Sequence, residues 1–141
     1  MVGVTDLSAL CGRYGLDALY AFGSRATEVA ACVRAAGELD PAKAADLDFG
    51  VLAQPGRAVD VDDRVHLAMA LEDLFDVPRV DLVVLPQAGP YLALDVVSGE
   101  LLYCTDPIRE AEYQLFVLRR AGDLAFFERE RRHHLLSGIA P

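Results

Sequence analysis

The sequence predicts an α/β protein, more narrowly an α+β two-layer domain in which a small mixed β-sheet is flanked by helices. Two observations lead to this class. Short apolar runs of strand length alternate with longer stretches of helical pattern, and glycine or proline separates most neighbouring elements. The chain has 141 residues with neither an internal repeat nor a linker, so we expect residues 1–141 to form a single domain.

Helices and strands are predicted to alternate along the whole chain. The predicted helices lie at 4–14, 24–36, 60–75, 90–97 and 106–136, and the predicted strands lie at 18–22, 46–52, 80–85 and 101–103. The first helix ends at Gly15, which suits a helix C-cap, and the second is rich in alanine and ends at Gly37. Residues 38–45 lie between the second helix and the strand at 46–52. They contain Asp40-Pro41, which predicts a turn or a broken second piece of helix.

The strands are predicted from their length and pattern. The run at 18–22 is apolar and aromatic and stops sharply at a Gly-Ser pair, while 46–52 alternates between acidic or small residues on one face and apolar residues on the other. The run at 80–85 is apolar except for Asp81, so we expect a central strand that is buried on both faces. The last strand is short and is expected at an edge of the sheet.

Two of the helices are long. The helix at 60–75 begins with clustered aspartates, which the helix dipole favours. Its apolar face is predicted to consist of Val61, Val65, Ala68 and Phe75, with Met69 and Leu71 beside it. Asp106 as N-cap and Pro107 at the first helical position open the last helix, which Gly122 is expected to interrupt. This helix is apolar on more than one side, so we expect one side to pack on the sheet and another to contact a partner or form a homo-oligomer.

The composition limits the partners and the compartment. With 13 basic and 22 acidic residues, the net charge is −9, which repels nucleic acid, so direct nucleic-acid binding is not expected. The three cysteines show no CxxC spacing and are expected to be reduced. No signal peptide is recognised, and no apolar run approaches the ~20 residues of a membrane span. These features predict a cytoplasmic protein without a membrane segment.

Three carboxylates are candidates for metal binding. Asp46 and Asp48 are two residues apart in a strand, so both point to one face, within reach of one divalent cation such as Mg²⁺. Asp81 lies in an apolar strand, where a lone charge is costly unless it is paired, hydrogen-bonded or bound to a metal. Plainer alternatives exist, because acidic residues alternate on solvated strand faces and Asp81 can meet solvent or Arg79 at the start of its strand.

Gly23 and Ser24 follow a strand and open a helix. Glycine lets a phosphate approach the backbone closely, and a helix N-terminus offers free amides and the positive end of a dipole. The Ser24 hydroxyl can donate to a phosphate oxygen, and Arg25 can add positive charge. A tight turn with a serine cap is the alternative here. The order of the motifs, which is a phosphate-binding turn, an acidic strand and a further acidic strand, favours the functional interpretation.

In this order, the motifs resemble those of the minimal nucleotidyltransferases of the DNA polymerase beta superfamily. The matching segments are residues 19–26, 46–52 and 80–83. Residues 99–107 and the long helix after them are similar to the antitoxin branch, whose members are paired with HEPN-type ribonuclease toxins. The resemblance covers roughly residues 16–130. One departure is the 21 residues between Ser24 and Asp46, which exceed the family's spacing and either cap the pocket or impair nucleotide entry.

The resemblance implies a polymerase beta-like nucleotidyltransferase fold and a reaction that uses two Mg²⁺ ions. The residues that it implies are Asp46, Asp48 and Asp81 for catalysis and metal binding, and Gly23, Ser24 and Arg25 for nucleotide binding. The implied reaction transfers AMP from ATP to a hydroxyl of the HEPN toxin, which is a tyrosine hydroxyl in the antitoxin branch. Two alternatives stay open: a non-catalytic antitoxin that neutralises the toxin by stoichiometric contact, and nucleotidyl transfer to a small molecule.

Overall fold

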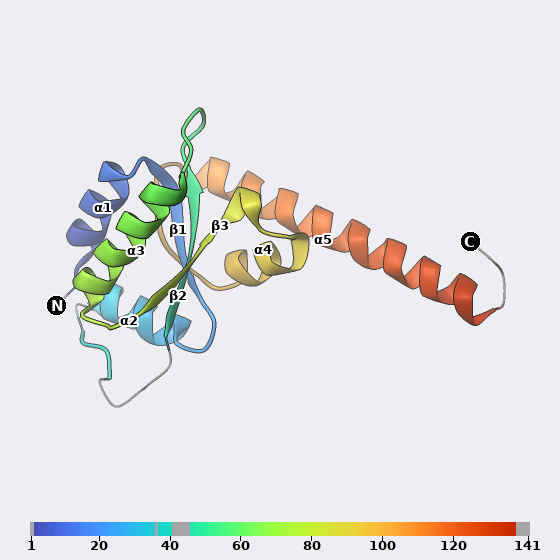
Figure 1. Cartoon of the computed structure of the whole chain (residues 1–141), viewed down its shortest axis with the longest axis horizontal. Coiled ribbons are helices and arrows are strands. Elements are labelled where there is room, and N and C mark those ends of the chain that lie inside the picture. The colour runs from blue at the N-terminus through green and yellow to red at the C-terminus, as the bar shows by residue number, and fades with distance from the viewer. Residues whose placement is uncertain (1, 36, 41–45, 138–141) are drawn as a thin grey trace.

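A computed structural model describes residues 2–35, 37–40 and 46–137. The elements are α1 (Val4–Arg13), β1 (Leu16–Phe22), α2 (Ala26–Ala35), β2 (Leu47–Ala53), α3 (Val61–Phe75), β3 (Val80–Val84), the 3-10 turn η1 (Leu85–Gln87), α4 (Pro90–Val97), β4 (Glu100–Cys104) and α5 (Pro107–Leu136). This is the predicted alternation, with small shifts at the ends (Figure 1). Of the predicted turn or helix piece at 38–45, residues 38–40 form neither helix nor strand, and 41–45 lie outside the described residues.

The four strands form one mixed sheet in the order β3-β2-β1-β4. β1 pairs antiparallel with both β2 and β4, whereas β2 and β3 are parallel. The predicted fold class, a small mixed sheet flanked by helices, is confirmed. The layering differs, because α1, α2 and α3 cover one face of the sheet and α4 and α5 cover the other (Figure 1). The molecule therefore has three layers, since β1 carries apolar side chains on both of its faces.

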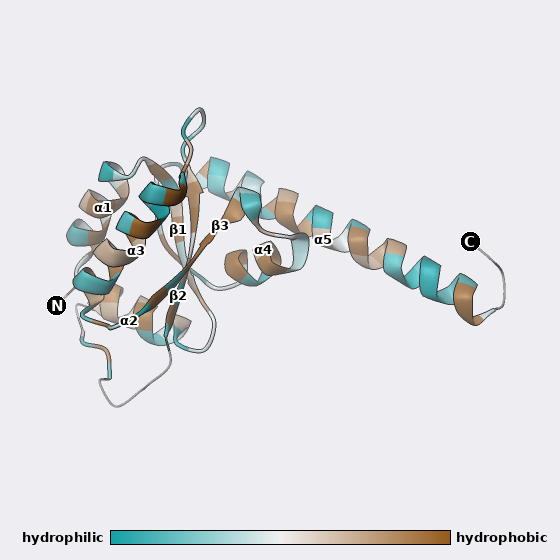
Figure 2. Ribbon diagram, viewed as in Figure 1, coloured by the Kyte–Doolittle hydropathy of each residue, from teal (hydrophilic) through white to brown (hydrophobic). Residues whose placement is uncertain are grey.

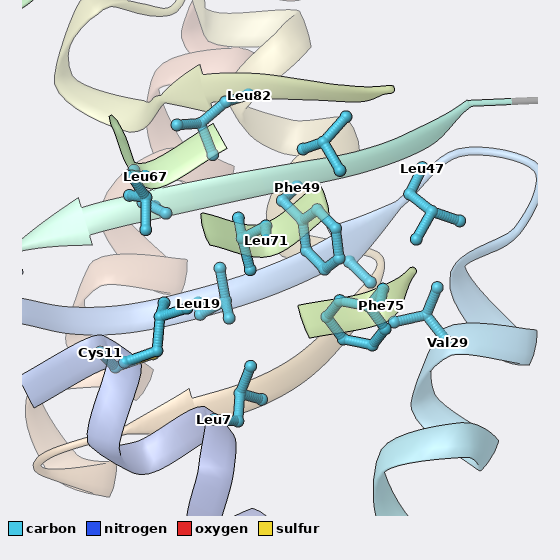
Figure 3. Close-up of a cluster of buried hydrophobic side chains, with 14 of the residues drawn as sticks. Leu7, Cys11, Leu19, Val29, Leu47, Phe49, Leu67, Leu71, Phe75 and Leu82 are labelled. Atoms are coloured by element: carbon cyan, nitrogen blue, oxygen red, sulfur yellow. The ribbon is translucent and has the colours of Figure 1, made fainter. Parts of the chain in front are cut away.

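Each face of the sheet has its own hydrophobic core. On the face of α1–α3, Phe49 of β2 packs against Phe75 of α3 with ring centroids 5.3 Å apart (Figure 3). On the other face, fully buried Tyr20 packs with Val96 of α4 and Val117 of α5. Burying the Tyr20 hydroxyl without a hydrogen-bond partner would be costly. It donates a 2.8 Å hydrogen bond to Glu110 of α5. The two cores hold the strand ends in a fixed relation to the helices.

The prediction that β3 is a central strand buried on both faces is wrong. β3 lies at the edge of the sheet, and the Asp81 side chain is 50% exposed. Side chains of α3 cover the edge, because the Val80 N–H donates to Glu72 at 3.1 Å and Arg64 donates to the Leu82 carbonyl at 2.7 Å. The apolar pattern is misleading here because a covered edge strand is nearly as apolar as a central one.

The predicted apolar face of α3 is also wrong. Val61 and Val65 are 78% and 52% exposed, and the buried face consists of Leu67, Leu71 and Phe75, which are four residues apart. Apolar residues occur around most of α3, so the helical period alone selects no single face. The sheet selects it, because only one side of α3 can contact Phe49 and its neighbours.

We expect Leu71→Ala to lower the free energy of unfolding by about 2–5 kcal/mol, because Leu71 is fully buried and its loss leaves a cavity. Val65→Ala, on the face that the sequence pattern favours, is expected to change it by less than about 0.5 kcal/mol. Urea unfolding of both variants measures the two values. A larger loss for Val65→Ala than for Leu71→Ala would contradict the observed orientation of α3.

The last helix, α5, is continuous through Gly122, so the predicted interruption is wrong. A single helical glycine costs only about 1 kcal/mol, which the rest of a long helix tolerates. None of residues 122–136 is buried, and this half of α5 extends away from the sheet (Figure 1). Figure 2 shows apolar and polar residues interspersed along it. Among the described helices, none is long and apolar enough to cross a membrane.

The start of α5 is tied to β1 by Asp17. This buried carboxylate accepts hydrogen bonds from Nε and Nη2 of Arg109, at 3.2 and 2.5 Å, and from the Thr105 hydroxyl. Burial alone would raise the pKa of Asp17, but the hydrogen bonds from Arg109 and Thr105 outweigh it and hold the pKa below its usual range. The charged form of Asp17 is therefore the one that stabilises the fold.

Asp17→Asn is expected to lower the free energy of unfolding by about 1–2 kcal/mol near neutral pH. Since the pKa of Asp17 is lower in the folded state, its contribution is complete above the unfolded pKa of about 4 and is lost as the pH falls through the folded value. The difference between wild type and variant should therefore shrink in acid. Urea unfolding across an acidic pH series checks this, and a pH-independent difference would contradict it.

Candidate functional site

The predicted phosphate-binding turn connects β1 to α2. β1 ends at Phe22, α2 begins at Ala26, and the Ala26 N–H donates to the Gly23 carbonyl at 3.3 Å, which closes the turn. Gly23 has a φ of +78°, in the left-handed region that favours glycine. Both Gly23 and Ser24 are exposed. The turn thus presents open backbone at the start of a helix, as an anion site requires.

Asp48 lies directly beside this turn. In the antiparallel register of β1 and β2, Phe22 is opposite Asp48. A Cβ atom on residue 23 would be 2.5 Å from Oδ2 of Asp48, so any other residue would force this carboxylate or the turn to shift. The pairing of β1 with β2 therefore joins the glycine turn and the acidic motif, which are well separated in the sequence.

The other two carboxylates belong to the same end of the sheet. The parallel register places Asp81 opposite Asp48, and Asp46 immediately precedes β2, whose predicted start is one residue early. Burial, and then the negative charges of Asp81 and Asp46, raise the pKa of the half-buried Asp48. The structure therefore brings together the three predicted carboxylates and the glycine turn.

Arg79 lies between two of these carboxylates. Its Nε is 3.4 Å from Oδ2 of Asp46, and its Nη2 is 3.5 Å from Oδ1 of Asp81. The sequence suggests Arg79 only as an alternative partner of Asp81, and the pairing with Asp46 is not foreseen. The spacing of Arg79 and Asp81, two residues apart, already indicates that both side chains lie on one face of the strand. The contact with Asp46 also needs the strand register, in which Leu47 is opposite Val80.

Arg25, the third predicted nucleotide-binding residue, is buried, with 6% of its surface exposed. Its guanidinium donates to both oxygens of Glu28, at 2.9 and 3.2 Å, and to the carbonyl of Asp40 at 3.3 Å. The Asp40 N–H also donates to Glu28 at 2.8 Å. In this structure Arg25 therefore joins the start of α2 to residues 37–40 and supports the turn from within the fold.

The donor set suits a divalent cation. Carboxylate oxygens are the ligands that Mg²⁺ prefers. Burial raises the pKa of Asp48 most, and the charges of Asp81 and Asp46, which a cation would offset, raise it further. As the side chains stand, no three His, Cys, Asp or Glu residues in the described part of the chain converge on one point as metal ligands. Arg79 engages two of the three carboxylates. The chemistry of the carboxylates fits a metal.

An open pocket of about 540 Å³ adjoins the glycine turn, between the start of α2 and the end of α4. Thr27, Asp95 and Ser98 contribute polar groups to its wall, and no arginine or lysine occurs among the described residues that line it. Two segments that carry sequence motifs, 19–26 and 99–107, meet at this pocket through Gly23 and Glu100, and the contribution of α4 is not foreseen. A larger groove of about 870 Å³ between α1 and α3 contains none of the candidate site residues.

Comparison with known proteins identifies the family and the fold of the chain. The model of the family "Polymerase beta, Nucleotidyltransferase" matches residues 6–108. A solved toxin–antitoxin structure with AMP-PNP is similar with a TM-score of 0.66 and 22% identity, over 97% of this chain and 98% of that chain. A chain in the solved structure of a tri-AMPylated Shewanella oneidensis HEPN toxin in complex with MNT antitoxin is also similar. The TM-score is 0.59 and the identity 24%, over 97% of this chain and 96% of that chain. A comparison with curated proteins found no significant match.

The solved structures agree in fold along almost the whole chain, and the family model spans the glycine turn and all three carboxylates. The predicted resemblance to the polymerase beta nucleotidyltransferases and the predicted enzyme class, a nucleotidyltransferase, are therefore confirmed. The chain belongs to the polymerase beta nucleotidyltransferase family.

Proposed function

We propose that this chain is the antitoxin of a toxin–antitoxin pair and that it transfers AMP from ATP to a tyrosine hydroxyl of a HEPN toxin. The observation that carries the proposal is the close approach of Asp48 to the Gly23 turn, with Asp81 opposite Asp48. It unites a phosphate-binding backbone with carboxylates at one end of the sheet. The similar structures support the partner and the nucleotide, because one contains AMP-PNP and another an AMPylated HEPN toxin.

In the proposed mechanism, the chain's residues hold the triphosphate and the attacking hydroxyl. Asp46, Asp48 and Asp81 would hold two Mg²⁺ ions, which supply charge neutralisation and activation of the nucleophile. The tyrosine oxygen forms a bond to the α-phosphorus of ATP, and the bond from that phosphorus to the bridging oxygen breaks. The open backbone at Gly23 and the exposed Ser24 hydroxyl bind the β- and γ-phosphates, which leave as pyrophosphate. Asp81 is half exposed at the sheet edge, so a hydroxyl from another protein can reach it, and its carboxylate accepts the proton of that hydroxyl.

Two further roles complete the proposal. Arg25 stays a predicted nucleotide ligand, and its bonds to Glu28 and Asp40 favour support of the turn over direct contact. The outer half of α5 is the proposed docking surface for the toxin, because Phe127 is 70% and Leu136 is 83% exposed on a helix that leaves the domain. About fifteen residues of unsupported helix are only marginally stable in water, so a covering partner is expected.

The intact mass of the partner tests the proposed function. The chain is co-purified with a co-expressed HEPN protein and incubated with ATP and Mg²⁺, and EDTA is added to a parallel sample. We expect the HEPN protein to gain the mass of one or more AMP units only when the metal is present. If the HEPN protein keeps its mass but shows no ribonuclease activity in the complex, the chain is a non-catalytic antitoxin instead. A HEPN protein that is neither bound nor modified would overturn both antitoxin functions and leave transfer to a small molecule.

A further inference from the structure

The guanidinium of Arg79 occupies the space between the carboxylates that the proposed function assigns to metal binding. Arg79 just precedes β3 and, by extension of the register in which Leu47 is opposite Val80, faces Asp46. It is also two residues before Asp81, so the side chains of both residues lie on one face of the strand. One positive charge therefore contacts both Asp46, which is two residues before Asp48, and Asp81, which is opposite Asp48.

From this geometry we infer that Arg79 is an internal counter-ion of the metal-free site, which competes with a divalent cation for Asp46 and Asp81. This inference rests on the proposed function, because it takes the same carboxylates as the metal ligands. A carboxylate oxygen that is paired with the guanidinium is not free to converge with Asp48 around a cation. This accounts for three nearby carboxylates that do not converge among the described residues.

The contacts of Arg79 with the two carboxylates are weak enough for a cation to displace its guanidinium. Its side chain is 69% exposed and its two contacts are 3.4 and 3.5 Å long, so water can replace them at little cost. Arg25 contrasts with it, because that guanidinium is buried, 2.9 Å from Glu28, and bonded to the backbone as well. Arg79 thus offsets part of the carboxylate charge in the metal-free protein and is released when a stronger cation arrives.

The binding of Mn²⁺ alone, used as the probe, tests the inference without any activity measurement. Arg79→Gln removes the charge at nearly constant length, and calorimetry at fixed ionic strength gives the affinity. Arg34→Gln is the control for the lost charge, because Arg34 is 59% exposed, makes a 3.4 Å ion pair with Glu100 rather than with any of the three carboxylates, and donates to the Leu101 carbonyl at 3.3 Å. Both variants change the net charge equally, so any difference between them is local.

We expect Arg79→Gln to bind Mn²⁺ about three- to ten-fold more tightly than wild type, a modest factor that suits two exposed ion pairs, and Arg34→Gln to bind within about two-fold of wild type. Mn²⁺ should also raise the melting temperature of Arg79→Gln more than that of Arg34→Gln. Mn²⁺ binding that Arg79→Gln leaves equal or weaker overturns the inference alone. Absence of Mn²⁺ binding in all three proteins overturns the metal site of the proposed function and the inference with it.

Discussion

Asp48→Asn is expected to abolish AMP transfer, with a loss of about 10³-fold or more, while the fold is retained. Asp48 adjoins both the Gly23 turn and Asp81, so it is the carboxylate that connects the proposed phosphate site to the proposed nucleophile site. Asparagine keeps the size of the side chain and removes the charge that a metal requires. The measurement is the initial rate at which the co-purified HEPN protein gains AMP units.

The same substitution should stabilise the metal-free protein. Burial and the charges of Asp81 and Asp46 raise the pKa of Asp48, so its ionised form disfavours the folded state, and this penalty grows as the pH rises through the folded pKa. Near neutral pH without metal, Asp48→Asn is therefore expected to melt at a higher temperature than wild type. Loss of activity together with higher stability is typical of a functional residue. An exposed aspartate elsewhere, Asp73, is the control, and Asp73→Asn should alter neither quantity. Undiminished AMP transfer by Asp48→Asn would refute the assignment.

Gly23→Ala is expected to reduce both stability and AMP transfer. The φ of +78° is strained for alanine, and the added Cβ would lie 2.5 Å from Oδ2 of Asp48, so the carboxylate or the turn has to move. We expect a loss of about 1–3 kcal/mol in the free energy of unfolding. A displacement of about 1 Å in a reacting group costs about 10²-fold in rate, so a similar loss of transfer is expected.

Gly56 offers a matched control for this substitution. It has the same φ of +78°, but a Cβ there would meet no atom within 4 Å. Gly56→Ala should therefore show the backbone strain alone, with a loss of about 1–2 kcal/mol and unchanged AMP transfer. Urea unfolding and the AMP-transfer rate are measured for both variants. If Gly23→Ala retained full activity and lost no more stability than Gly56→Ala, the contact between the turn and Asp48 would have no functional weight.

The elements and the motif order could be predicted from the sequence because both depend on local chemistry. Gly15 ends α1 with a positive φ, Asp106 and Pro107 open α5, and the Gly-Ser turn follows a buried strand. The order of the glycine turn, the acidic strand and the second acidic strand was sufficient to indicate the family that the comparison confirms. These features need only the preferences of each residue and its immediate neighbours.

The wrong predictions concern features that depend on tertiary contacts between distant segments. The apolar run of β3 is compatible with a central or an edge position. It lies at the edge, where Arg64 and Glu72 of α3 bond to its backbone in place of another strand. The apolar residues of α3 are compatible with more than one face, and contact with the sheet selects Leu71. The contacts of Arg25 with Glu28 and the Asp40 carbonyl are likewise visible only in the tertiary structure, and nucleotide binding by Arg25 stays a prediction.

The sequence by itself determined the alternation of elements, the glycine turn and the identity of the three carboxylates, because these follow from backbone preference and residue type. Only the tertiary structure decided that β1 and β2 pair so that Asp48 adjoins Gly23, that β3 adds Asp81 at an exposed edge, and that Arg79 lies between Asp46 and Asp81. Strand order and register arise from the fit of whole faces around two cores, and that fit is a property of the assembled chain rather than of any segment.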